Sequence, residues 1–370
     1  MYMGMVIFVT WVALTPWILL YGAYEGPKVF WFWIGGFFLT LMWITVLLKS
    51  EKISVPVRDV WLLVWIGILS VASLVGIHPL DSFIGGGYRH QGVLFFFTLF
   101  LVLETLRRVT SENKKLLVGL LGAGVAFESV IILIQKLGDM SGRPLGTFGE
   151  PNAVAGFLAI GLYWIFRMPQ IAGNLKKICS ALVIAAIIAT ESRTGLAVAF
   201  IVCVASGFPM TAVGKHINTK RILYFSGLLL AGIACIVLMR GIFEKRPASN
   251  YESRPLYWQL GLQALSLSPD LGYGAESEEV IYEKRYARMN VRLIDLTIDR
   301  SHNIFLDVAL WSGVIGLFVF CGWLVGMGRE YIVSGDYRRF FVFISWIVFA
   351  SVQPLGVVHW VYLVLLAASV

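Results

Sequence analysis

Charged residues and cysteines are scarce in this sequence. Only 14% of its 370 residues are charged, whereas 58% are hydrophobic, and this balance is typical of a protein that is surrounded by lipid. The cysteines lie inside apolar runs without CxxC spacing, which argues against disulfides and cysteine-bound metal. We predict that they are small core residues: Cys179, Cys203, Cys235 and Cys321.

Internal repeats and nucleic-acid motifs are also missing. The chain has 22 acidic and 30 basic residues, with a formal net charge of +8. Because the basic residues flank apolar runs, we expect them to set membrane topology instead of binding nucleic acid. No DxD pair occurs, and the loop between the first two apolar runs offers a single carboxylate, Glu25. We therefore predict no metal ion, no cofactor and no nucleic-acid partner.

Long apolar runs make up most of the chain. A spanning helix needs roughly 20 apolar residues at about 1.5 Å per residue. Hydropathy therefore predicts an all-α polytopic membrane protein, with residues 1–370 forming a single integral membrane domain. The first run has no basic start and no small-residue cleavage site, so it is expected to be a retained helix and not a signal peptide. About twelve spans are predicted, at residues 3–22, 29–48, 60–77, 91–106, 116–135, 152–168, 178–191, 194–213, 222–240, 303–326, 340–355 and 358–370.

Basic residues fall unequally on the two sides of these spans. One side holds sixteen: Lys49, Lys52, Arg58, Arg107, Arg108, Lys114, Lys115, Arg167, Lys176, Lys177, Lys215, Lys220, Arg221, Arg329, Arg338 and Arg339. The short loops on the other side hold five: Lys28, Arg89, Lys136, Arg143 and Arg193. Since cytoplasmic loops carry the excess of Lys and Arg, residues 241–301 are predicted to form a long extracytoplasmic loop between spans nine and ten.

This loop is basic and is expected to be partly helical. Nine of the thirty Lys and Arg residues lie within residues 240–300, so an anion is the expected ligand. Helices are predicted at residues 254–267 and 277–294, with Ser277 as the N-cap of the second. Gly272-Tyr273-Gly274 is expected to form a turn between them.

Three arginines at the same face are candidates for binding a substrate. Arg193 lies in a very short link between two spans, and its guanidinium offers paired donors to phosphate oxygens. The alternative is that it pairs with Glu191 or reaches the lipid headgroups. Arg89 lies in a glycine-rich loop that can approach a ligand closely, and Arg143 precedes another outer turn.

Two glutamates within or at the ends of spans, Glu104 and Glu128, are expected to pair with neighbouring groups and not to act in catalysis. Charges near the bilayer centre cost about 2.5–3.5 kcal/mol, so those that are retained need such partners.

His302 is the candidate catalytic residue. Histidine has an unperturbed pKa of roughly 6.5, which suits proton abstraction near neutral pH. It lies between Ser301 and Asn303, where the loop re-enters the membrane on the same face as Arg193 and Arg254. In the alternative interpretation, one of its neighbours caps the following helix and the histidine only accompanies that helix start.

All of the candidate site residues except Arg143 lie within five short motifs that occur in order between residues 80 and 320. Together these motifs resemble the O-antigen ligase and O-antigen polymerase superfamily of bacterial envelope glycosyltransferases. The pair His302-Asn303, opening a span after a long outer loop, is the most specific of them. The motifs are YRHQG at 88–92, GTFGEPNAVAGFL at 146–158, ESRTG at 191–195, SRPLYW at 253–258 and SHNIFLDVALWSGVIGL at 301–317.

The resemblance implies transfer of a glycan from an undecaprenyl-diphosphate carrier, without metal, on the outer face of the bacterial cytoplasmic membrane. It assigns diphosphate binding to Arg193 and Arg254 and activation of a hydroxyl acceptor to His302. Arg89, Arg143 and Asn303 complete the predicted substrate-binding set. The expected partners are the lipid-linked glycan donor, a glycan or lipid-glycan acceptor and the lipid bilayer.

Several functions remain open at this stage. The ligase-like enzyme could use a lipid A core sugar or a protein hydroxyl as its acceptor, whereas a polymerase of the same superfamily uses the end of another carrier-linked chain. A secondary transporter of an anionic lipid or solute is the rival from another class. Transporters bind at the membrane midplane between repeats, whereas here the polar residues gather on one face.

Overall fold

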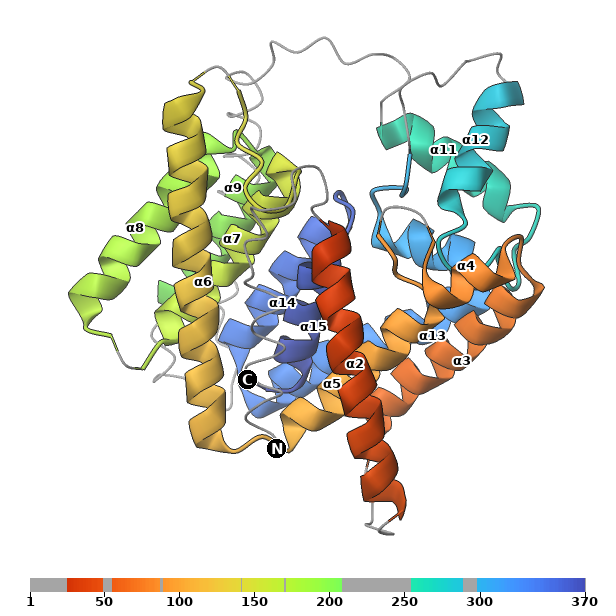
Figure 1. The fold of residues 1–370 in the computed structure, drawn as a ribbon, viewed down its shortest axis with the longest axis horizontal. Helices are drawn as coiled ribbons and strands as arrows, with labels where there is room; N and C mark the ends of the chain where they lie inside the picture. Colours follow the sequence, from red (N-terminus) through yellow and green to blue (C-terminus); the bar gives the residue numbers. More distant parts are fainter. Residues whose placement is uncertain are drawn as a thin grey trace, which may run out of the picture.

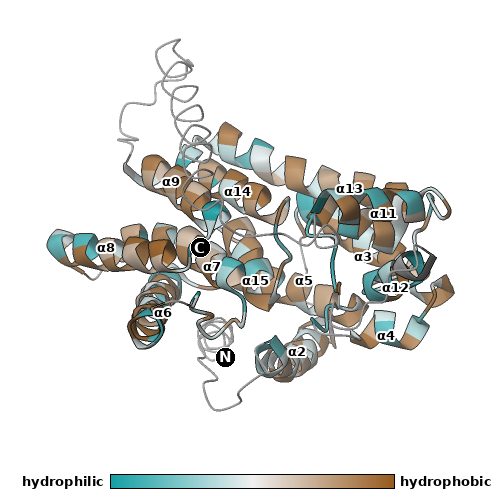
Figure 2. Ribbon diagram, turned by 90° about the horizontal axis from the view of Figure 1, so that it is seen from above, coloured by the Kyte–Doolittle hydropathy of each residue, from teal (hydrophilic) through white to brown (hydrophobic). Residues whose placement is uncertain are grey.

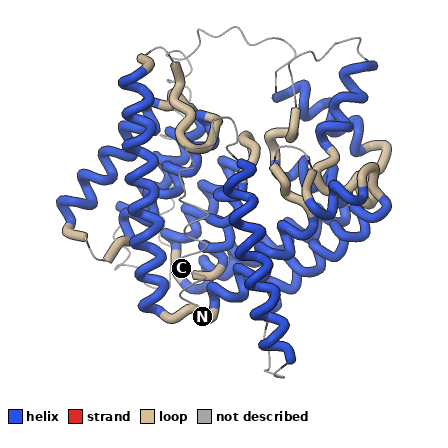
Figure 3. The backbone as a smooth tube through the Cα atoms, in the orientation of Figure 1, coloured by secondary structure: helices blue, strands red, loops and turns tan. Residues whose placement is uncertain are grey.

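The computed structural model describes residues 25–48, 55–86, 89–140, 142–169, 171–207, 254–288 and 298–369. Within these ranges the chain forms helices and no strand, which confirms the all-α prediction for the described part (Figure 3). The predicted spans at 3–22 and 222–240 lie outside the described residues. The helices are α2 (Glu25–Leu48), α3 (Val57–Val75), α4 (Pro79–Ile84), α5 (Val93–Arg107), α6 (Ser111–Gly138), α7 (Pro151–Arg167), α8 (Gly173–Ala189), α9 (Arg193–Gly207), α11 (Arg254–Leu265), α12 (Glu278–Arg288), α13 (Ile304–Ser334), α14 (Tyr337–Ala350) and α15 (Val357–Ala367).

Four of the described helices are long and apolar enough to cross a membrane by length and composition. They are Glu25–Val46, Val57–Val75, Ser111–Gly138 and Ile304–Ser334. Other described helices coincide with predicted spans but are shorter, so the number twelve stays a prediction.

Helix α15 occupies the centre of the described bundle. All 11 of its residues are buried, as expected for a helix that is hydrophobic on every side. It packs against α2, α5, α7 and α14. Helices α6 to α9 lie on one side of this centre, and α3, α13 and the short helices α4, α11 and α12 lie on the other (Figures 1 and 2).

Helix α13 is broken near its start. Gly313 has a φ of 68°, and a Cβ at this position would collide with the connection between α11 and α12. That connection supplies the hydrogen bonds that the break leaves open, because Tyr273 N donates to Leu310 O (2.7 Å) and Val314 N donates to Pro269 O (2.8 Å). The predicted turn at Gly272-Tyr273-Gly274 therefore fastens α11 and α12 to a membrane helix. The break itself was not predicted.

Charged residues gather at the two ends of the bundle. At one end Arg58 contacts both Asp59 (2.9 Å) and Glu330 (2.5 Å), and Arg107 also contacts Asp59, which ties α3, α5 and α13 together. Arg58 and Arg107 belong to the predicted cytoplasmic set. Helices α11 and α12 lie at the other end (Figure 1). The structure thus groups these loops as the charge pattern predicted, and which end faces outward stays a prediction.

Candidate functional site

Four of the five residues from Asp299 to Asn303 have side chains held by specific partners. Asp299 pairs with Arg89 through Oδ2 and Nε, 2.5 Å apart. Arg300 is buried between two carboxylates, with its nitrogens 2.9 Å from Glu276 and 3.0 Å from Glu278. Its guanidinium also lies over the ring of Trp311, 4.8 Å from the centroid.

Ser301 is held through every polar group that it has. Its backbone N donates to Asp307 Oδ1 (2.8 Å), and its carbonyl accepts from Trp258 Nε1 (3.1 Å). Its Oγ accepts a hydrogen bond from the hydroxyl of Tyr282 (2.7 Å). Helices α11, α12 and α13 therefore meet at the residue that precedes His302.

Asn303 is the N-cap of α13. Its Oδ1 accepts from the backbone N of Phe305 (3.0 Å) and of Leu306 (3.3 Å), two of the amides that a helix start leaves unpaired. Capping thus accounts for the described contacts of Asn303, and its predicted role in substrate binding stays a prediction.

His302 differs from its neighbours. Its Nδ1 is buried and has no hydrogen-bond partner among the described residues. Its backbone has a φ of 56°, a left-handed conformation that costs a non-glycine residue about 1–3 kcal/mol and is found mostly where the surroundings impose it. The ring of Tyr257 lies 5.8 Å from the imidazole, centroid to centroid. The segment therefore presents one unpaired imidazole nitrogen among side chains that are already engaged.

The electrostatic environment keeps this imidazole neutral. Burial lowers the pKa of His302 to about 4, with Asp299 opposing the shift and Arg254 and Arg89 adding to it. A neutral imidazole with an unpaired nitrogen can accept a proton from a hydroxyl group at neutral pH.

Glu150, just before α7, belongs to the same electrostatic cluster. Burial raises the pKa of its carboxyl and Asp299 raises it further, whereas Arg89, Asn152 and Arg254 oppose the shift. Sequence reasoning gave no role to Glu150 or to Asp299. Glu150 stood inside a recognised motif, but nothing in the sequence indicated that residues so far apart face the same arginines.

Arg193 and Arg254 occupy equivalent positions, each as the first residue of a helix, α9 and α11 respectively. At α9, Ser192 Oγ accepts from Gly195 N (3.2 Å), so the helix start is capped. Helix starts expose backbone N–H groups and favour anions, so a guanidinium at a helix start strengthens the binding of an anion there. Arg254 acts electrostatically on His302. Glu191, the suggested partner of Arg193, contacts Lys136 at 3.2 Å.

Arg143 connects three segments at the same face. Its Nε donates to Thr190 O (2.8 Å), and a terminal nitrogen donates to Asn152 Oδ1 (3.0 Å). These contacts hold the turn before α7 against the link that carries Arg193. The structure thus gives Arg143 a role in fixing loops, and its role in binding is still a prediction.

The expectation for the two span glutamates is confirmed. Glu104 pairs with Arg108 at 3.2 Å, and Glu128 accepts hydrogen bonds from the backbone and side chain of Thr147.

Ser277, the predicted N-cap of α12, caps the helix through its backbone but not through its side chain. Its carbonyl accepts the first hydrogen bond of α12, but its Oγ has no partner among the described residues, because the first turn is instead occupied by contacts between Glu278 and the Arg300 segment.

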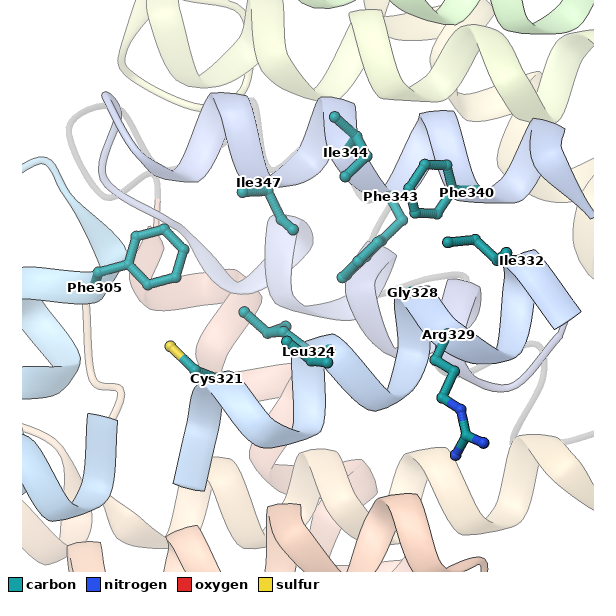
Figure 4. Close-up of a pocket in the computed structure, with 11 residues that line it drawn as sticks. Phe305, Cys321, Leu324, Gly328, Arg329, Ile332, Phe340, Phe343, Ile344 and Ile347 are labelled. Carbon is teal, nitrogen blue, oxygen red and sulfur yellow. The ribbon is translucent and has the colours of Figure 1, made fainter. Parts of the chain in front are cut away.

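An apolar groove of about 450 Å³ lies between α13 and α14 (Figure 4). This volume falls within the roughly 300–1,000 Å³ of ligand pockets. Phe305 and Arg329 lie at its opposite ends in the view of Figure 4, and Phe305 follows His302 by three residues. The lining residues are Phe305, Cys321, Leu324, Val325, Gly328, Arg329, Ile332, Phe340, Phe343, Ile344 and Ile347.

Among the described residues, no group of three or more His, Cys, Asp or Glu side chains is placed to hold a metal ion. The three cysteines in this part of the chain, Cys179, Cys203 and Cys321, are free thiols of intermediate burial, so the prediction that they are core residues is not borne out.

Comparisons with known proteins agree with the motif-based resemblance. Residues 178–321 match a family model described as O-Antigen ligase. This range includes Arg193, Arg254 and His302, whereas Arg89 and Arg143 lie before it.

Two proteins of Acinetobacter baylyi are similar to the chain. The ComP-specific O-oligosaccharyltransferase is 24% identical over 301 residues, which cover 73% of this chain and 52% of the relative. The General O-oligosaccharyltransferase is 23% identical over 201 residues, covering 49% and 34%. The chain thus spans about half or less of the length of these relatives. The matches confirm the resemblance to the O-antigen ligase superfamily.

Proposed function

We propose that this protein is a metal-independent glycosyltransferase. It moves a glycan from an undecaprenyl-diphosphate carrier to a hydroxyl acceptor at the extracytoplasmic face of the bacterial cytoplasmic membrane. The observation that carries the proposal is the unpaired Nδ1 of His302, buried beside Arg254 and between neighbours whose side chains are engaged.

The chemistry balances with the residues at hand. His302 takes the proton from the acceptor hydroxyl, and the acceptor oxygen forms a bond to the anomeric carbon. The bond from that carbon to the diphosphate oxygen breaks, and the diphosphate leaves with the electron pair. Arg193 and Arg254 stabilise the departing charge, because guanidinium groups bind phosphate oxygens with paired donors in a fixed geometry.

The position of the site supports a lipid-linked donor. A polyprenyl carrier has a charged diphosphate and a long apolar chain, so its enzyme needs charged and apolar surfaces that adjoin. The groove between α13 and α14 begins at Phe305, close in sequence to His302. This arrangement supports a carrier whose diphosphate meets the arginines while its chain lies along α13.

The acceptor is proposed as a hydroxyl group. The names of both similar proteins describe O-linked transfer of an oligosaccharide, and one is named ComP-specific while the other is called general. Lipid A core sugar, the end of a second lipid-linked chain and a protein hydroxyl are therefore the three acceptors to compare. A preference for the second would make the protein a polymerase.

The test combines donor binding, turnover and melting temperature for three variants. His302→Ala should lower turnover by about 10²–10⁴-fold while donor binding and melting temperature stay near those of the parent, since a general base contributes little to ground-state binding. Arg193→Ala should weaken donor binding. His78→Ala, which removes an exposed histidine before α4, is the matched control and should turn over normally.

A stable His302→Ala protein with ordinary turnover would overturn the assignment. Carrier binding with no transfer to any of the three acceptors, in the parent protein, would favour the transporter.

A further inference from the structure

Two hydrogen bonds to Ser301 are donated by α11 and α12, which are not among the described helices long and apolar enough to cross a membrane. Trp258 belongs to α11 and Tyr282 to α12, and they approach the carbonyl and the hydroxyl of Ser301 respectively. The Tyr282 hydroxyl also lies 3.2 Å from the carbonyl oxygen of Tyr257, whose ring faces His302. One hydroxyl therefore contacts both the residue before the imidazole and the residue beside it.

These helices are themselves fixed to the membrane helices at their far end. Tyr273, in their connection, accepts from Ile77 N (3.2 Å) through its carbonyl and donates to Leu310 O through its N. Next to it, Ala275 N donates to Ser73 Oγ (3.2 Å). Because the connection is anchored to both α3 and α13, Tyr282 and Trp258 act from a rigid support.

The unit formed by α11, α12 and their connection also carries Arg254, a candidate for binding the donor. Arg254 opens α11, one turn before Trp258, and acts electrostatically on His302. The placement of α11 and α12 thus sets the distance between the guanidinium that is proposed to hold the diphosphate and the imidazole that is proposed to take the proton. Small displacements between such groups are costly, since a shift of about 1 Å can lower a rate by about 10²-fold.

We propose that Tyr282, together with Trp258, is a positioning residue for transfer. Its hydrogen bond to Ser301 holds the imidazole of His302 at a fixed position relative to the guanidinium of Arg254. This inference rests on the proposed function. Tyr282 has no contact with the reacting atoms in this arrangement, and it acts through Ser301. The left-handed backbone of His302 requires such support from its neighbours.

Tyr282→Phe removes the hydroxyl and keeps the ring, so it removes the hydrogen bond to Ser301 Oγ together with the contact to Tyr257 O. We expect kcat to fall by about tenfold or more, with donor KM within about twofold of the parent. Tyr273→Phe is the matched control, because its hydroxyl makes a similar bond to a backbone carbonyl of the same unit, Ala264 O at 2.8 Å, without touching Ser301. Tyr273→Phe should keep its kcat.

Ser301→Ala removes the other partner of the same bond, and it decides the question if Tyr282→Phe does not fold. It should lower kcat to a similar extent, and the double variant should be no slower than the slower single one, because both changes remove one interaction. Equal losses in Tyr273→Phe and Tyr282→Phe, or multiplying losses in the double variant, would overturn the proposal. If His302→Ala abolishes transfer while Tyr282→Phe and Ser301→Ala retain it, only this inference fails. Ordinary turnover in His302→Ala would instead end the proposed function.

Discussion

Arg89 Nε lies 2.5 Å from Asp299 Oδ2, and the arginine side chain is only 7% exposed. The pair joins the loop before α5 to the segment that carries His302. Burial raises the pKa of Asp299, but Arg89, Arg300 and His302 lower it below its ordinary value, so the carboxylate stays ionised. The charge of Arg89 is therefore compensated by a carboxylate, although the sequence had suggested a substrate-binding role.

Arg89→Ala should destabilise the protein by at most about 3–5 kcal/mol, because it leaves the carboxylate of Asp299, which is 22% exposed, uncompensated. A double variant, Arg89→Ala with Asp299→Ala, should recover part of this loss, since no lone charge then remains. Thermal unfolding of the single and double variants in detergent would measure both effects. Weakened donor binding with an unchanged melting temperature in Arg89→Ala would instead support the role suggested by the sequence.

Replacement of Asn303 separates capping from substrate binding. Ser and Asp are N-caps of similar strength to Asn, so Asn303→Ser should keep both stability and turnover, whereas Asn303→Ala should lose about 0.5–2 kcal/mol of stability. The comparison uses melting temperature together with kcat/KM for the donor. If Asn303→Ser keeps its melting temperature but loses kcat/KM, the amide contacts the substrate after all.

The loss of kcat/KM on the acid side of the pH profile should occur only at low pH. His302 must be neutral to act as a base, and its pKa is lowered to about 4, so kcat/KM at pH 5 should be about 0.9 of its value at pH 7.5. A histidine with an ordinary pKa would retain only about 0.03 of that activity at pH 5. Arg254→Gln removes one of the charges that lower the pKa, so its acid limb should move to higher pH even though its donor binding is weaker.

The same shift has a consequence for stability. Because the folded pKa lies below the unfolded value of roughly 6.5, the contribution of His302 is complete above that value and is lost as the pH falls through 4. The free energy of unfolding of His302→Gln should therefore fall less steeply at acid pH than that of the parent protein. An acid limb near pH 6.5 in the parent would contradict the burial of the imidazole.

Much of the helical architecture followed from hydropathy and local chemistry. Spans predicted at 116–135 and 303–326 appear as the longer helices α6 and α13, because apolar periodicity sets where a membrane helix exists but leaves its ends uncertain. The helix predicted at 254–267 appears as α11, with Pro255 in its first turn. The break at Gly313 could not be predicted, since a single glycine in an apolar run is compatible with a continuous helix.

The sequence by itself determined the class of the protein, the position of His302 at the start of a membrane helix and the motifs shared with the O-antigen ligases. These depend on composition and on residues that are close in the chain. Only the tertiary structure decided which charges are compensated. Arg89 and Arg300 find their carboxylates far away in the sequence, at Asp299 and Glu276, and such pairs form only when the helices pack. Packing likewise decided that helices α11, α12 and α13 engage Ser301 through all of its polar groups, whereas His302 Nδ1 has no hydrogen-bond partner in the described part of the chain.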